Sequence, residues 1–465
     1  MYHLRDLVLV ICTLALGCTS THVLEDPIAT MTDREAWFEK RRDAMTQARR
    51  EMPNDPRRIT ALEQILWQPG YPAWQRREAV EDLVEHDASA FRHSLARRIV
   101  LLNDWKTLKY ILRLAVDGNW ADTTPAIVRN YARRAKNIAD ADRPERRALE
   151  KLNPGKSAEQ VVFDVFASAD DSTSFRQQVA AWELLARLMK PGKLIKQLEI
   201  APSRSPLVID LKHAAAHLGV LPTAREGVIW LQHWGDPART ALYEAAAAAA
   251  AKLDNAQRRS LELRHLPVLM RLESSDFDLT RTQLVTQIHR AAQSANRYMI
   301  GPTYDGGARD WPQRFTAWSD QMSWGDLITL RVVMRAMRDR DLVATFFAQA
   351  DRDRDDKSTE YGGVLDVVDD RFVAMQYEPF IRKHDLKFIP SQKMIDRLYT
   401  AIAHYHFHAQ RYKNKRYAGP GFGDLKLADR LPFNYVVFTF IDRDRLNVDY
   451  YQRGRIVVDL GTIQR

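Results

Sequence analysis

The stretch that decides the fold is Asn434-Tyr435-Val436-Val437-Phe438-Thr439-Phe440-Ile441, near the end of a chain of 465 residues. Branched and aromatic side chains dominate it, which favours an extended strand over a helix. A helical segment over residues 391–401 lies upstream, with Ser391 as its expected N-cap. The end of the chain is therefore predicted to be an α/β domain. Four shorter runs have a similar strand-like character, at residues 364–368, 372–375, 446–450 and 455–461.

The preceding part of the chain, residues 33–353, has helical periodicity nearly throughout. Leu327, Leu330 and Val333, for example, recur at steps of three residues and are predicted to form one face of a helix. Proline and glycine residues separate the segments, and no fixed repeat length is present. We therefore predict an irregular, solenoid-like helical array over residues 34–353, followed by the α/β domain over residues 354–465.

The N-terminus resembles a bacterial lipoprotein signal. Arg5 precedes an apolar core over residues 7–16, which is shorter than the about 20 residues that span a bilayer. The core ends in Ala15-Leu16-Gly17-Cys18, which is similar to a lipobox, where the cysteine receives a lipid. An ordinary signal peptide or a buried N-terminal helix are the alternatives.

The lipobox resemblance implies a signal peptide over residues 1–17 and a tether over residues 18–33. The mature protein would lie outside the cytoplasm, in the cell envelope, held by membrane lipid through Cys18. Thr19, rather than aspartate, follows the cysteine. In a host with two membranes this favours the outer membrane.

The cysteine count restricts the chemistry. The chain has two cysteines, Cys12 and Cys18. By the lipobox resemblance, the first would leave with the signal peptide and the second would carry the lipid. The mature chain is therefore expected to have no disulfide and no thiol chemistry. Any metal site must use histidine, aspartate and glutamate.

The charge of the chain argues against a nucleic-acid partner. The net charge is +9, from 69 basic and 60 acidic residues, and the basic residues are spread along the helices. Nucleic-acid binding requires a concentrated basic patch with aromatic side chains for stacking. A surface that faces anionic lipid or envelope polymers explains the mild excess at least as well.

The motif Ala403-His404-Tyr405-His406-Phe407-His408 contains three of the 13 histidines of the chain. Residues two apart on a strand point to the same side, so His406 and His408 can converge on one ion. His404 is a possible alternative ligand. A polar strand face with hydrogen-bonded histidines is the competing interpretation.

Two other segments offer carboxylates. Gly421-Phe422-Gly423-Asp424 is a glycine-rich turn that could supply Asp424 as a third ligand and leave the fourth position of zinc open for water. Glu360 stands at the entry to a predicted strand. Such a carboxylate can take a proton from the activated water and pass it to a leaving amine.

In sequence order, Glu360, the His-x-His motif and Gly-x-x-Asp resemble the JAMM/MPN metallopeptidases, which read Glu, His-x-His and Ser-x-x-Asp. The resemblance covers the last quarter of the chain. It implies that His406, His408 and Asp424 bind Zn²⁺ and that Glu360 is the general base. Tyr405 matches the aromatic residue that often precedes the first histidine, which favours His406 over His404.

Two positions depart from the family pattern. Ala409 replaces the proline after the second histidine, and Gly421 replaces the serine that hydrogen-bonds the oxyanion. Loss of one oxyanion donor costs a typical enzyme about 10²–10³ in turnover. The backbone N–H groups of Gly421 and Gly423 are the candidates to replace it. The segment before Asp424 is also longer than usual, and residues 411–416 are basic.

Two functions follow as expectations. The first is a membrane-anchored zinc-dependent hydrolase of amide or isopeptide bonds, whose helical region binds an unidentified protein or envelope substrate. The second is a non-catalytic surface lipoprotein scaffold with a degenerate JAMM-like domain. In the second, zinc would be structural, with His404 closing its coordination shell.

The acidic run Asp351-x-Asp353-x-Asp355 begins like a calcium-binding loop. Its sixth position is Asp356 rather than glycine, and its twelfth is Gly362 rather than glutamate. We therefore expect a solvated, charged linker there.

Overall fold

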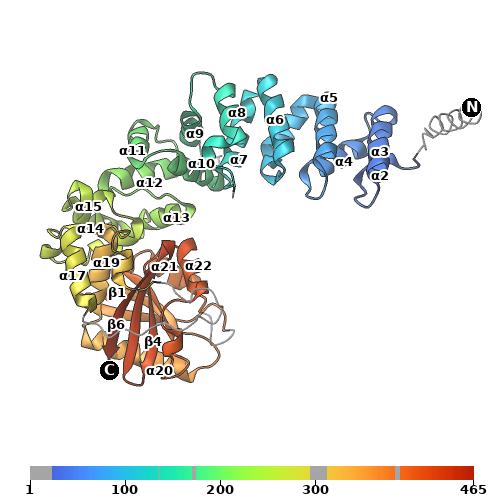
Figure 1. The fold of residues 1–465 in the computed structure, drawn as a ribbon. Coiled ribbons are helices and arrows are strands. Elements are labelled where there is room, and N and C mark those ends of the chain that lie inside the picture. The colour runs from blue at the N-terminus through green and yellow to red at the C-terminus, as the bar shows by residue number, and fades with distance from the viewer. Residues whose placement is uncertain (1–23, 136, 170–173, 294–311, 383–387) are drawn as a thin grey trace, which may run out of the picture. The chain divides into compact units, whose positions relative to one another are not determined.

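The computed structural model describes residues 24–135, 137–169, 174–293, 312–382 and 388–465 (Figure 1). Its contacts divide the chain into two compact units, Met1–Val165 and Phe166–Arg465. The predicted signal peptide and Cys18 lie outside the described residues. Within the described ranges, every helix is too short or too polar to cross a membrane.

The first unit is helical. Several of its helices begin at an aspartate whose carboxylate accepts backbone N–H groups of the first turn, as Asp26, Asp55 and Asp104 do. The helices bury their apolar faces against one another, and Ile65 and Ile111 are fully buried. The helices of this part are α2 (Pro27–Thr32), α3 (Phe38–Glu51), α4 (Pro56–Trp67), α5 (Ala73–Arg98), α6 (Trp105–Asp117), α7 (Thr124–Ala132), α8 (Pro144–Leu152) and α9 (Ala158–Ala167), which crosses the division.

Ion pairs lie in the interior of this helical unit. Arg58 donates to Asp82 over 2.8 Å, and both side chains are buried. Arg143 likewise contacts Glu145, which also accepts a hydrogen bond of 2.8 Å from the Asn130 amide. Each of these buried charges therefore lies beside an opposite charge.

The second unit begins with further helices. Leu327, Leu330 and Val333 lie on one helix, as predicted, and this helix is buried on most of its sides. The helices are α10 (Phe175–Leu188), α11 (Pro191–Ile200), α12 (Pro206–His213), α13 (Arg225–Trp234), α14 (Thr240–Ala251), α15 (Asn255–Arg259), α16 (Leu266–Leu269), α17 (Arg281–Gln293), α18 (Phe315–Trp318), α19 (Trp324–Ala336) and α20 (Arg340–Asp355).

A six-stranded sheet closes the chain, in the order β2-β1-β3-β4-β5-β6. Only the β3–β4 pair is parallel among the described strand pairs, because a helix connects those two strands. The elements are β1 (Gly362–Val368), β2 (Arg371–Tyr377), α21 (Gln392–Leu398), β3 (Ala403–His408), α22 (Phe422–Arg430), β4 (Tyr435–Asp442), β5 (Arg445–Gln452) and β6 (Ile456–Gln464).

These elements agree with the predicted class, a mainly helical chain that ends in a mixed sheet (Figure 1). The predicted strands are present, and Ser391 caps α21 as expected. The solenoid-like repeat and the JAMM/MPN fold stay predictions.

The two faces of the sheet are covered by different helices. On one face, Phe346 of α20 packs against the rings of Tyr405, Phe407 and Phe438. The alternate residues of β3 are histidines and lie on the other face, where α22 contributes its Asp424. The candidate site therefore lies between β3 and α22.

The expectation of a solvated linker around Asp353 is wrong. The helix α20 continues to Asp355, and Asp353 is fully buried. Its carboxylate accepts a hydrogen bond from the backbone N–H of Tyr361. A buried carboxylate requires such a donor, and this contact fixes the entry to β1.

The helices of the second unit also contact the sheet region directly. The indole N–H groups of Trp230 and Trp234 both donate to the carbonyl of Tyr399, over 2.6 and 2.8 Å. The buried Arg264 donates to Asn434, which directly precedes β4, and to Gln452 at the end of β5. The chain passes from helices to strands between α20 and β1, but the helices from α10 onward and the sheet belong to one compact unit.

Candidate functional site

The strand β3 places the three histidines on one face of the sheet. His406 lies opposite Gly362 of β1 and Val437 of β4, in the interior of the sheet. His404 and His406 are buried, whereas His408, at the strand end, is partly exposed. The alternation that the sequence predicted is therefore present.

The helix α22 delivers the carboxylate. Gly421 is its N-cap, and Asp424 lies in the first turn. The backbone N–H of Gly421 donates to Asp424 Oδ2 over 2.7 Å, which orients the carboxylate at the helix end. Gly-x-x-Asp thus acts as a capping motif that aims Asp424 at the histidine-bearing face.

The two histidines and the aspartate meet. Nε2 of His406 lies 3.5 Å from Asp424 Oδ2, and Nε2 of His408 lies 3.7 Å from the same oxygen. One ligand atom from each of the three residues lies within 4.8 Å of the others. In tetrahedral zinc sites, ligands at about 2.0–2.1 Å from the ion are about 3.3 Å apart, so these spacings are close to those of an ion-binding set.

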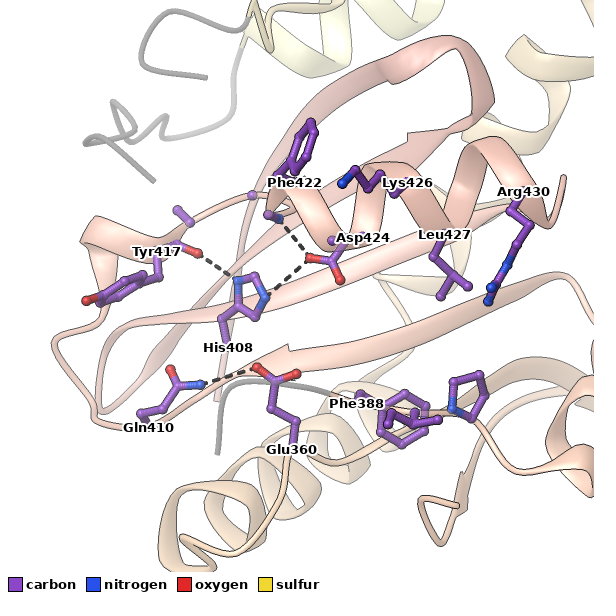
Figure 2. A pocket seen from close by; sticks show the side chains of 16 residues that line it. Glu360, Phe388, His408, Gln410, Tyr417, Phe422, Asp424, Lys426, Leu427 and Arg430 are labelled. Carbon is purple, nitrogen blue, oxygen red and sulfur yellow. Dashed lines mark hydrogen bonds and ion pairs between the residues drawn. The ribbon is translucent and has the colours of Figure 1, made fainter. Parts of the chain in front are cut away.

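The orientation of His408 suits this role. Its Nδ1 lies 2.8 Å from the carbonyl oxygen of Tyr417, so Nδ1 carries the proton and donates it (Figure 2). The lone pair is then on Nε2, which faces Asp424. A hydrogen bond to the other ring nitrogen is the usual way in which proteins orient a metal-binding histidine.

The buried imidazole of His406 lacks hydrogen-bond partners among the described residues. Its Nε2 contacts Asp424 only at the 3.5 Å ion-pair distance. Leaving a buried polar group without a partner costs about 1–3 kcal/mol, so such groups usually serve a ligand, an ion or an ordered water. A metal ion would satisfy His406, and the donor set fits one.

The protonation states also suit metal binding. Burial, together with the nearby His406, lowers the pKa of His408. Burial opposes ionisation of Asp424, but His406, His408 and the Gly421 N–H outweigh it and hold its pKa well below the usual range. At neutral pH His408 is therefore neutral and Asp424 is ionised, which are the forms that bind metal.

His404 lies on the same face but outside the group of three. Its ring packs beside those of Phe388 and Tyr435, at centroid distances of 5.6 and 5.3 Å. Burial lowers its pKa well below the ordinary value, so this histidine is neutral. Neither of its ring nitrogens has a hydrogen-bond partner in the described structure.

Glu360 lies at the entry to β1, as the sequence indicated. The backbone N–H of Phe407 donates to the carbonyl of Tyr361 over 3.2 Å, which extends the pairing of β1 and β3 by one residue. The next position in that antiparallel register places Glu360 opposite His408. Both side chains line the same cavity (Figure 2), and Gln410 Nε2 lies 3.5 Å from Glu360 Oε1.

The two glycines have different environments. The N–H of Gly421 is already donated to Asp424, so it is committed to orienting the carboxylate. Gly423 lies in the first turn of α22, where N–H groups have no partner within the helix, and it lines the cavity. Of the two candidate oxyanion donors, Gly423 is therefore the one with an available N–H.

The cavity beside these residues has a volume of about 630 Å³. Glu360, His408 and Asp424 contribute polar atoms to its lining. Figure 2 shows their side chains directed into this space, with Phe388 on another wall. Its size is within the usual range of about 300–1,000 Å³ for ligand-binding pockets.

Tyr451 was missed by the sequence analysis. It lies opposite Tyr435 in the β4–β5 pair, and its ring centroid is 6.3 Å from that of His406. Its hydroxyl is buried without a hydrogen-bond partner among the described residues. Burial, Asp424, Tyr435 and Glu360 raise the pKa of Tyr451 well above its usual value, so the phenol stays protonated.

A pair of buried acids was also missed. Asp449 lies opposite Asp459 in the β5–β6 pair, and both are buried on the histidine-bearing face. Burial and the charge of Asp459 raise the pKa of Asp449 well above the ordinary value. The β5–β6 register brings these two residues together, and this register cannot be predicted from the local sequence.

Comparison of the chain with models of protein families, with curated proteins and with solved structures found no match. The functional interpretation therefore depends on the geometry of the site. Two imidazoles and one carboxylate converge there, and His408 and Asp424 of this group line a cavity that Glu360 also lines.

Proposed function

We propose that the C-terminal part of the chain is a JAMM-like, zinc-dependent hydrolase of amide or isopeptide bonds. The single observation that carries the proposal is the convergence of His406, His408 and Asp424 beside Glu360. Two imidazole nitrogens and one carboxylate oxygen are a ligand set that catalytic zinc sites use.

His406, His408 and Asp424 would hold the zinc ion through two Nε2 atoms and one carboxylate oxygen. When bound, zinc lowers the pKa of a water molecule towards about 7 and polarises a carbonyl group. The carbonyl of Tyr417 keeps His408 in the tautomer that presents Nε2. The Gly421 N–H holds Asp424 in place at the start of α22.

Glu360 would move the proton. It accepts a proton from the attacking water, whose oxygen forms the new bond to the carbonyl carbon. As the C–N bond breaks, the same carboxyl group gives that proton to the leaving amine. Its position opposite His408, on the wall of the same cavity, supports this role.

Gly423 would stabilise the oxyanion through its backbone N–H, because Gly421 is committed to Asp424. A single backbone donor replaces the serine hydroxyl of the family pattern. The expected result is a functional but slow site, since each oxyanion donor is worth about 10²–10³ in turnover.

The rest of the protein would serve the same activity at a surface. A lipid on Cys18 would hold the protein in the cell envelope, at the outer membrane in a host with two membranes. The helical region would bind a protein or envelope substrate. This part of the proposal depends on the lipobox and on the helical sequence pattern.

A second candidate function is a non-catalytic lipoprotein scaffold. Gly421 in place of serine, and the buried His404 with both ring nitrogens unpartnered among the described residues, favour it. In that case zinc would be structural, and His404 would become the fourth protein ligand.

The deciding experiment is metal analysis of three purified variants beside the wild type. We expect about one zinc per wild-type chain by elemental mass spectrometry, loss of zinc in His408→Ala, and retention in His404→Ala and Glu360→Gln. His93→Ala, at an exposed position of the first unit, is the matched control.

The outcomes separate the two candidates. A wild type without zinc after zinc-replete purification contradicts both the hydrolase and the structural zinc. Loss of zinc in His404→Ala supports the scaffold, since a fourth protein ligand closes the shell. Retained zinc in Glu360→Gln, together with loss of peptide-bond hydrolysis, supports the hydrolase. Acyl labelling that disappears in Cys18→Ala tests the lipid anchor.

A further inference from the structure

We propose that the cavity selects substrates with a carboxylate close to the scissile amide, and that Lys426 and Arg430 bind this carboxylate. The inference rests on the proposed hydrolase and names its substrate class. Both residues line the same cavity as Glu360, His408 and Asp424.

One helix carries the metal ligand and the two cations. Asp424, Lys426 and Arg430 all belong to α22, and the two cations are separated by one helical turn. Figure 2 shows Asp424 near the start of the helix, beside His408, and Arg430 at the far end of the helix. A ligand beside α22 therefore meets the candidate metal centre first and the positive side chains farther along.

The cations of the cavity lack acidic partners, in contrast to neighbouring arginines. Neither Lys426 nor Arg430 makes an ion pair with the described residues. The acid next to Arg430, Asp429, instead lies 3.8 Å from Arg455. Arg453 is paired with Glu262 over 2.6 Å. The two positive side chains that line the cavity, Lys426 and Arg430, are therefore available to bind an anion.

An aromatic ring holds one of these cations at the cavity. The ammonium group of Lys426 lies 4.2 Å from the ring centroid of Phe422, which also lines the cavity. Such a contact orients an exposed lysine for about 0.5–1 kcal/mol while leaving its three N–H donors available.

The remaining walls indicate the rest of the ligand. Phe388, Ile389, Pro390 and Leu427 give the cavity an apolar lining. These residues suit the aliphatic part of a peptide, while the guanidinium of Arg430 can bind a carboxylate through two parallel hydrogen bonds. Glu360 and Asp424 repel a carboxylate from the metal end, so the charges also fix the direction in which the substrate binds.

The test is equilibrium binding to Glu360→Gln protein, which should retain its site but not turn the peptide over. The probes are acetyl-Ala-Glu-Ala-amide, acetyl-Ala-Gln-Ala-amide and acetyl-Ala-Gln-Ala with a free carboxyl terminus, measured by titration calorimetry with zinc present. We expect the two carboxylate peptides to bind about tenfold more tightly than the neutral one. Comparison of the two acidic peptides shows whether a side-chain or a terminal carboxylate is preferred.

The same titrations in Lys426→Gln and Arg430→Gln, each combined with Glu360→Gln, complete the test. The preference for carboxylate should fall to less than about twofold in Arg430→Gln and weaken in Lys426→Gln. Arg443→Gln, an exposed arginine of the β4–β5 turn outside the cavity, is the matched control.

Three results would overturn the inference: equal affinity for the acidic and neutral peptides, a preference that survives both substitutions, or no binding of any peptide. Its failure is distinguishable from failure of the hydrolase. If the protein retains zinc but binds acidic and neutral peptides equally, only the proposed substrate class is contradicted. A carboxylate preference in protein that binds no zinc sinks only the metal-dependent activity.

Discussion

The buried polar groups of the first helical unit differ from those on the histidine-bearing face of the sheet. In the helices, the buried charges of Arg58 and Arg143 lie beside those of Asp82 and Glu145, although Nε of Arg58 has no hydrogen-bond partner among the described residues. On the sheet, His406 and Tyr451 have buried polar atoms without hydrogen-bond partners among the described residues. The helical residues are therefore charges that neutralise each other, whereas on the sheet a whole imidazole, with both ring nitrogens, and a phenol hydroxyl lack partners.

The same property extends from β3 to β5. The register puts all these sheet residues on the face that α22 covers. Desolvation of so many polar groups costs stability, and a protein retains that cost where the groups have another use. The residues of β3 and β5 on this face with at least one such atom are His404, His406, Asn447, Asp449 and Tyr451; Asp366 of β1 also has one, but it is paired with Arg397.

The largest expected effect is on stability and comes from removing one partner of a buried ion pair in the helical unit. Arg143→Ala leaves Glu145 fully buried without its charge partner. We expect a loss of about 3–5 kcal/mol in the free energy of unfolding of this unit, because an uncompensated buried charge is costly. Urea unfolding measures this loss. The control is Arg147→Ala, at an exposed position of α8, the helix that contains Glu145; it should change the free energy of unfolding by less than about 0.5 kcal/mol. A near-neutral Arg143→Ala would remove the distinction between the two regions.

The second prediction concerns zinc binding by the candidate ligands on the sheet. Zinc in excess should stabilise the wild type by about 4 kcal/mol at 1,000 times its dissociation constant, since only the folded chain assembles the site. His406→Ala should abolish this gain, because it removes one of the three candidate ligands. Thermal unfolding with and without zinc measures both. A zinc-dependent gain in His406→Ala equal to that of the wild type would mean that zinc binds elsewhere.

A smaller effect concerns the missing oxyanion donor. A side-chain Cβ at position 421 would lie 3.5 Å from Asp424 Oδ2, an ordinary contact, so serine fits there. We expect Gly421→Ser to raise turnover by about tenfold or more. Gly421→Ala adds the methylene without the hydroxyl and should leave the rate near that of the wild type. Equal rates in the two variants would show that the hydroxyl has no oxyanion to bind.

The smallest effect is a pH dependence of stability. The buried Asp449 faces Asp459 and Asn447, and its pKa is raised by burial and by Asp459. The native state then binds more protons than the unfolded chain, so stability should fall as pH rises from about 4 towards the raised pKa.

Asp449→Asn should flatten this slope, which is at most about 1.4 kcal/mol per pH unit for one proton. Unfolding free energies measured from pH 4 to 8 provide the test. The matched control is Asp369→Asn, in the exposed turn between β1 and β2. An unchanged slope in Asp449→Asn would mean that the acid pair does not titrate in this range.

Local sequence patterns were sufficient to predict most helices and strands and the shared face of the three histidines. The alternation of His404, His406 and His408 indicated their shared face, and Ser391 indicated a helix start. Local patterns report such features because they depend on neighbouring residues.

Features that depend on pairing between distant segments could not be predicted. Asp353 looked like part of a solvated linker, but a backbone N–H eight residues away holds it in the interior. Tyr451 reaches the site only because β5 pairs with β4, and Asp449 meets Asp459 only through the β5–β6 register. No single segment of the sequence contains that information.

One oxygen of Asp424 has two duties, since Oδ2 accepts the Gly421 N–H and faces both imidazoles. An ion that draws on this oxygen weakens the hydrogen bond at the first turn of α22. The amide proton of Gly421 therefore becomes a built-in sensor: its chemical shift and its exchange with solvent should follow occupancy of the centre, even in a protein whose substrate is unidentified.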